Sequence, residues 1–268
     1  MTPMTPGGRP KKAIARLRAK RARKGSVGWL PRFATLGFVV AVLAGLAELL
    51  AGFGYQWGWW HYQTGFTILR SAAPTALGAA LVALIGCFAT RGHRVKLIAG
   101  LVGIAIGVAA FALPYSVQLS RPRGLPSIND ITTDTADPPK FVALIPLRKG
   151  ATTSPDYGGD EVAEVQRRAY PNIAPIDRNV APNIAFEMCL EAAQALGWEV
   201  VTMVPPEGRI EAVATSWLFG FKDDVVIRIT PRDGGSRIDI RSKSRLGRND
   251  YGANARRIGA FEKKLRAE

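Results

Sequence analysis

Charged side chains recur at alternate positions in two stretches of the carboxyl-terminal half, around residues 223–228 and 237–245. Residues two apart on a strand share one face of a sheet. We therefore expect Asp224 and Arg228 to lie on one face, and Asp239, Arg241 and Arg245 to do so on the neighbouring strand. Arginine guanidinium groups match the oxygens of phosphate and carboxylate groups. The pattern predicts a site for an anionic head group.

Polar residues of the last helix and of the same strands complete this candidate site. Asn254 and Arg257 lie one turn apart on a helix. The candidate binding residues are Asp223, Asp224, Arg228, Asp239, Arg241, Ser242, Ser244, Arg245, Asn254 and Arg257. A second interpretation stays open, because cross-strand ion pairs on a solvated face also fix strand register.

The sequence contains no recognisable catalytic motif. Ser242 and Ser244 have no histidine in their half of the chain, which excludes a Ser-His-Asp triad there. Asp223 and Asp224 are adjacent on a strand and point to opposite faces, so they are not a facing acid–base pair. Neither a Gly-rich phosphate loop nor metal-ligand spacing is found. We expect no catalytic residue, no metal site and no cofactor.

The charge of the chain is unevenly distributed. The 268 residues carry a formal net charge of +15. Residues 1–120 contain 14 Lys and Arg and a single acid, whereas residues 121–268 contain 22 Lys and Arg and 20 acids. The basic half is also the more apolar half, which predicts a membrane protein with a basic tail at residues 1–32 and no nucleic-acid partner.

Three apolar stretches, 33–54, 66–89 and 97–117, are each long enough to cross about 30 Å of hydrocarbon as a helix. The basic tail and the basic loop at 91–96 belong inside, and the aromatic loop at 55–62 belongs outside. This topology predicts a multi-pass protein of a bacterial inner membrane with residues 118–268 in the periplasm or otherwise outside the cytoplasm.

Two ionised side chains fall at membrane depth. Glu48 and Arg70 lie on consecutive antiparallel helices, and we expect them to form an intramembrane ion pair; a transport or proton-relay role for Glu48 is the alternative. Small residues at four-residue steps in the first and third helices predict a compact bundle, with a homo-oligomer as a further expectation.

The remaining chain predicts a separate α+β domain. Residues 118–140 form a Pro-rich tether and residues 141–268 the domain, with strands at 141–147, 198–204, 209–218, 221–230 and 236–242. A helix of 183–196 and a last helix opened by Asn249 or Asp250 pack on the sheet. The expected fold class is membrane-anchored α+β: three transmembrane helices, then an antiparallel sheet with two packed helices, in the order β-α-β-β-β-β-α.

Several ordered blocks of this domain resemble a known family. They are residues 125–134, the run Asp137-Pro138-Pro139, and residues 208–212, 220–228, 239–248 and 250–258. The chain resembles the family called domain of unknown function 1499 over about residues 125–265. The resemblance implies an envelope-associated domain, often preceded by membrane helices, with no established activity.

Two functions follow as hypotheses. The first is a non-catalytic module that binds a lipid or other anionic amphiphile outside the cytoplasm, with membrane lipids as partners. The second is a structural or interaction protein whose outer domain docks onto another envelope protein. The alternating aromatic residues Trp217, Phe219 and Phe221 predict either an apolar groove or membrane contact, or else a buried core stripe.

Overall fold

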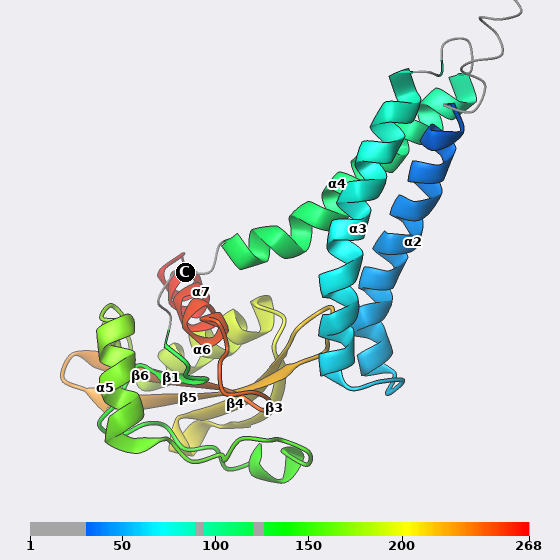
Figure 1. Ribbon diagram of the computed structural model, residues 1–268. Helices are drawn as coiled ribbons and strands as arrows, with labels where there is room; N and C mark the ends of the chain where they lie inside the picture. The colour runs from blue at the N-terminus through cyan, green and yellow to red at the C-terminus, as the bar shows by residue number, and fades with distance from the viewer. Residues whose placement is uncertain (1–30, 89, 91–93, 120–125, 268) are drawn as a thin grey trace, which may run out of the picture. The chain divides into compact units, whose positions relative to one another are not determined.

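The computed structural model describes residues 31–88, 90, 94–119 and 126–267, and Figure 1 shows their helices and strands. The chain divides after Gln118 into two compact units, a helical unit and a sheet unit. The basic tail expected at residues 1–32 lies outside the described residues except for Pro31 and Arg32, and so do residues 91–93 of the basic loop at 91–96.

The helical unit consists of three long helices, α2 (Pro31–Gln56), α3 (Tyr62–Phe88) and α4 (Arg94–Leu119). Each coincides with one of the predicted apolar stretches. All three are long and apolar enough to cross a membrane. They confirm the expected membrane part of the fold.

Small side chains let the three helices approach closely. A Cβ atom at Gly37 would overlap the backbone of α3 at Ala79 and Ala83, and one at Gly103 would overlap the backbone of Phe38 on α2. Ala44, Ala76 and Ala110 meet in one buried cluster contributed by all three helices. Without a hydrophobic driving force between helices in lipid, such close packing provides the attraction.

The expected ion pair between Glu48 and Arg70 is not formed. Glu48 is only 8% exposed, and its Oε1 atom has no hydrogen-bond partner among the described residues. Arg70 is exposed, because it precedes the buried Ala72 by two residues and therefore lies about 200° around α3 from the packed face. The two residues match in depth, but their positions around the helices keep them apart.

The sheet unit is built on a six-stranded antiparallel sheet in the order β1-β6-β5-β4-β3, with β2 also paired to β6. The strands are β1 (Asp130–Thr132), β2 (Ile176–Arg178), β3 (Glu199–Val204), β4 (Arg209–Thr215), β5 (Lys222–Arg232) and β6 (Gly235–Ser244). This sheet and its helices confirm the predicted α+β class. The four longer strands lie where the sequence predicts them.

The first strand is not where the sequence predicts it. Residues 141–147 contain the short 3-10 helix η1 (Ile145–Leu147) rather than a strand, because Pro146 lacks a backbone N–H and the N–H groups of 142–144 bind a side chain. Strand β1 lies instead within the expected tether, and β2 falls in a stretch where no strand was predicted. A second short 3-10 helix, η2 (Pro205–Glu207), joins β3 to β4.

Three helices accompany the sheet: α5 (Gly159–Ala169), α6 (Pro182–Ala195) and α7 (Ala253–Ala267). In Figure 1, α6 and α7 lie on one side of the sheet, and the green chain between β1 and α5 runs along the other side. Asp250 begins α7, since its carboxylate accepts hydrogen bonds from the backbone N–H groups of Gly252 and Asn254, both at 2.8 Å.

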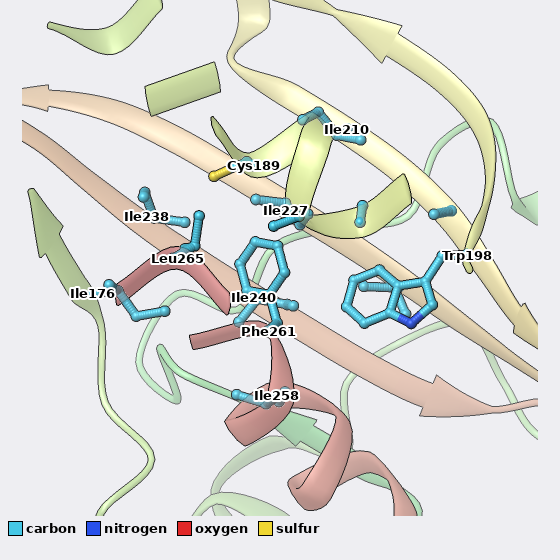
Figure 2. Close-up of a cluster of buried hydrophobic side chains, with 14 of the residues drawn as sticks. Ile176, Cys189, Trp198, Ile210, Ile227, Ile238, Ile240, Ile258, Phe261 and Leu265 are labelled. Atoms are coloured by element: carbon cyan, nitrogen blue, oxygen red, sulfur yellow. The ribbon is translucent and has the colours of Figure 1, made fainter. Parts of the chain in front are cut away.

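The main hydrophobic core lies between the sheet and the two helices α6 and α7. Figure 2 shows Ile227, Ile238 and Ile240 of β5 and β6 facing Cys189 of α6 and Phe261 of α7. The rings of Trp198 and Phe261 stack with their centroids 5.6 Å apart. This core occupies one face of the sheet and leaves the other to a different set of side chains.

Helix packing in the helical unit gives a direct test. A Cβ atom at Gly86 would overlap the backbone of Ala34, whereas one at Gly78 on the same helix would have no heavy atom within 4 Å. We expect Gly86→Ala to lower the stability of the unit by about 1–3 kcal/mol, and Gly78→Ala to leave it unchanged or raise it. Unfolding of the full chain in detergent measures the stability of both variants. Equal unfolding midpoints for the two variants would contradict the close packing at Gly86.

Candidate functional site

The charged residues of β5 and β6 that were predicted to share a face, among them Asp224, Arg228 and Arg241, do so on the side opposite the hydrophobic core. Asp224 pairs in register with Lys243, Val226 with Arg241, and Arg228 with Asp239. The chain from Pro139 to Tyr157 covers this face, as its hydrogen bonds to β6 show. The charges of Asp224, Arg241 and Lys243 are therefore buried between the sheet and the loop rather than exposed on a solvated face.

Asp130 of β1 binds two of these cations. Its carboxylate accepts hydrogen bonds from Arg241 Nε at 2.9 Å and Nη2 at 2.8 Å, and from Lys243 Nζ at 2.8 Å. Arg241 is only 2% exposed and ranks among the largest fully buried side chains of the described chain. Burial lowers the pKa of Lys243, while attraction to Asp130 opposes that shift.

Asp224 binds the other two cations. It accepts hydrogen bonds from Arg245 Nε at 2.9 Å and Nη2 at 2.6 Å, and it forms an ion pair with Arg148. We call Asp130, Asp224, Arg148, Arg241, Lys243 and Arg245 the buried charge cluster. It contains four cations and two carboxylates, so its formal charge is positive by two.

Backbone carbonyl groups of the covering loop accept the remaining hydrogen bonds of the cations. Arg241 donates to the carbonyl oxygens of Pro139 and Pro155, at 3.2 Å and 2.9 Å. Lys243 donates to that of Asp156 at 2.6 Å, and Arg245 to that of Leu147 at 2.9 Å. Besides the ion pair of Arg148 with Asp224, these neutral oxygens attach the loop to the sheet, and they face an excess of positive charge.

Two polar atoms at the edge of the cluster have no partner among the described residues. They are Nε of Arg148 and the hydroxyl oxygen of Tyr157, and both are buried. The guanidinium carbon of Arg241 lies 5.4 Å from the centre of the Tyr157 ring and 4.7 Å from that of Phe141. Burial raises the pKa of Tyr157 to about 12, so its hydroxyl is a neutral donor at physiological pH.

Glu211 of β4 holds the loop at a second place, and the sequence reasoning did not select it. Its fully buried carboxylate accepts hydrogen bonds from the backbone N–H groups of Val142, Ala143 and Leu144, each at 3.0 Å, and pairs with Arg209. The alternation along β4 sets Glu211 opposite the apolar residues Ile210 and Ala212, so the sequence gives no signal that it is buried. The three N–H groups that it binds lie 67 to 69 residues away.

The ten predicted site residues fall into three groups rather than one. Asp224, Arg241 and Arg245 belong to the buried charge cluster. Arg228 and Asp239 form a more exposed network with Asp134, Asp137 and Arg237. The other five lie on the helix-covered face, where Arg257 binds Asp223 and Ser242, and Asn254 binds Ser242 and Ser244.

The family described as "Protein of unknown function (DUF1499)" matches residues 130–265, which is about half of the chain. The chain belongs to the DUF1499 family. The matched range begins at Asp130 and takes in every residue of the buried charge cluster, so this cluster is part of the DUF1499 domain. No curated protein and no solved structure matches the chain.

The buried charge cluster predicts a large effect of removing one carboxylate. We expect Asp224→Ala to destabilise the sheet unit by about 3–5 kcal/mol, because it leaves Arg148 and Arg245 buried without a counter-charge. Asp177→Ala, which breaks the exposed pair with Arg232, should cost less than about 1 kcal/mol. Urea unfolding of the full chain, followed by near-UV circular dichroism, compares the two. Similar small losses would show that the cluster does not stabilise the fold.

Glu211 and Glu207 form a matched pair, since both bind Arg209 but only Glu211 is buried. We expect Glu211→Gln to speed hydrogen exchange at the N–H groups of 142–144, because a neutral amide is a weaker acceptor than a carboxylate. Glu207→Gln should leave these rates unchanged. Exchange mass spectrometry of peptides covering residues 140–149 measures both variants, and unchanged rates in Glu211→Gln would contradict this role.

Proposed function

We propose that the protein is a non-catalytic membrane module of a bacterial cell envelope whose DUF1499 domain binds a lipid or other anionic amphiphile. The observation that carries the proposal is the excess of two cations in the buried charge cluster. Burying an uncompensated cation costs several kcal/mol. An anionic group bound beside the cluster offsets that cost. The ligand that we propose is therefore negatively charged.

Two buried side chains offer hydrogen-bond donors to such a group. Nε of Arg148 and the hydroxyl of Tyr157 are both donors, both buried, and both without a partner among the described residues. Phosphate and carboxylate oxygens accept hydrogen bonds from both kinds of donor. We infer that the anionic head binds between them, with Arg241 close to Tyr157.

An apolar cluster beside the charges supports an amphiphile rather than a simple anion. Phe141, Leu144, Val213 and Val226 form a second small hydrophobic core on this face. Val226 is the register partner of Arg241, so the apolar and cationic side chains are neighbours on the sheet. A ligand with a charged head and an aliphatic part meets both chemistries here.

The covering loop provides a physical route for entry. Its carbonyl oxygens from Pro139 to Asp156 bind the cations as neutral acceptors. A bound anion attracts a cation through its full negative charge as well as through hydrogen bonds, whereas a carbonyl group offers the hydrogen bond alone. An anion can therefore exchange with individual carbonyl groups while the carboxylates of Asp130 and Asp224 stay in place.

The proposed location follows from the charge of the membrane half. Basic residues before α2 and between α3 and α4 favour the cytoplasmic side for both segments. Because three is an odd number of spans, this orientation supports a DUF1499 domain outside the cytoplasm, in the periplasm of an inner-membrane protein. The docking of another envelope protein is the alternative function, and the exposed side chain of Trp217 favours it, because tryptophan is enriched at protein interfaces.

The test identifies the molecule that stays bound to the domain after the domain is cut from the membrane helices. A protease site introduced at residues 120–125 releases the domain from full-length protein that has folded in its membrane, and native mass spectrometry then weighs it. We expect a stoichiometric anionic amphiphile on the wild-type domain. The Tyr157→Phe variant should lose most of the amphiphile. The substitution removes one buried donor but breaks no hydrogen bond within the described part of the protein.

Tyr170→Phe is the matched control, since Tyr170 is a partly buried tyrosine that packs against the main core. It should keep the amphiphile. An empty wild-type domain would refute lipid binding and favour protein docking. A ligand retained equally by both variants would place the site elsewhere on the domain.

A further inference from the structure

Three aliphatic side chains project from the outer side of the covering loop. Val142, Ile145 and Leu147 are 53%, 50% and 47% exposed. We call them the aliphatic turn, because Ile145 and Leu147 begin and end the 3-10 helix η1 and Val142 precedes it. Their neighbours Phe141 and Leu144 point inward and are buried in the second core, so this short segment is apolar on both sides.

The aliphatic turn is held in this exposed arrangement. The carboxylate of Glu211 accepts hydrogen bonds from three successive N–H groups at its start, and Arg245 donates to the carbonyl oxygen of Leu147 at its end. Both anchors are buried charged groups of the sheet. Rigid attachment prevents the aliphatic side chains from turning inward, where they would be shielded from water.

Basic residues flank the aliphatic turn on both sides. Lys140 precedes it and Lys149 follows it, and both are exposed. Along residues 140–149 the buried Arg148 is the remaining charged residue. Aliphatic side chains between lysines suit the boundary of a bilayer, where acyl chains accept the former and anionic head groups attract the latter.

We propose that the aliphatic turn inserts into the head-group region of a bilayer that contains anionic lipid. A membrane is favoured over a protein partner because the same chain carries three helices long and apolar enough to span one, which gives the domain a high effective concentration of lipid surface. The contact is independent of the proposed anion site. It uses the outer side of the loop, whereas the site uses the inner side.

The test measures the depth of a spin label on the full chain in nanodiscs. The chain has two cysteines, Cys87 and Cys189, which are replaced by Ser and Ala before Ile145→Cys is introduced and labelled. We expect oxygen to reach the label more readily than a polar nickel chelate in nanodiscs containing phosphatidylglycerol. Asp233→Cys, at the exposed β5–β6 turn, is the control position and should show the opposite preference.

Charge reversal tests the role of the lysines. Lys140→Glu combined with Lys149→Glu should lower the ratio of inserted to free label by about tenfold or more, since each lysine near an anionic surface contributes on the order of 1 kcal/mol. Tyr157→Phe should leave the label where it is, which separates this contact from the anion site.

Two outcomes would overturn the proposal. In the first, the label at position 145 remains accessible to the nickel chelate in phosphatidylglycerol nanodiscs. In the second, the label is shielded from oxygen and nickel alike, which would mean that a second copy of the chain or another protein covers the aliphatic turn.

Discussion

The sheet unit depends on one constraint, which is that a charged group buried in a protein must be matched by partners. Strand β6 directs Arg241, Lys243 and Arg245 onto the face away from the helices, where β5 supplies only Asp224 as a carboxylate. The other carboxylate must come from β1, as Asp130, and the remaining acceptors from loop carbonyls. The position of β1 and the path of residues 139–157 both satisfy this requirement.

The two faces of the sheet are therefore closed by different interactions. On one face, α6 and α7 bury aliphatic and aromatic side chains, and exposing them would lose contacts that nothing in water replaces. On the other face, hydrogen bonds to charged groups hold a loop, and an incoming anion can replace some of them. A ligand site is for this reason expected under the loop rather than under the helices.

The sequence predicted the features that depend on periodicity along the chain. The three apolar helices, the strands β4 to β6, and the common face of Asp224, Arg241 and Arg245 all follow from spacing within one element. The features it missed depend on partners that are far away in sequence. The pairing of β1 with β6 joins residues more than 100 positions apart, and a three-residue strand has too few residues to show a period.

Local reasoning failed in two further places for physical reasons of their own. The apolar residues from 141 to 147 are typical of a strand, but Pro146 and the carboxylate of Glu211 replace the ladder hydrogen bonds that a strand would need. Glu48 and Arg70 agree in depth, yet the depth of a residue does not determine its direction around the helix.

The loop from residue 139 to 157 links these constraints, because its inner and outer sides have opposite chemistries. Its inner side supplies acceptors to the buried cations, and Glu211 fixes the backbone, which leaves Val142, Ile145 and Leu147 exposed. A bilayer that covers the outer side would bring anionic head groups close to Arg148 and Tyr157, because both residues belong to this loop. Contact with lipid and binding of an anionic amphiphile would then use opposite sides of the same segment of the chain.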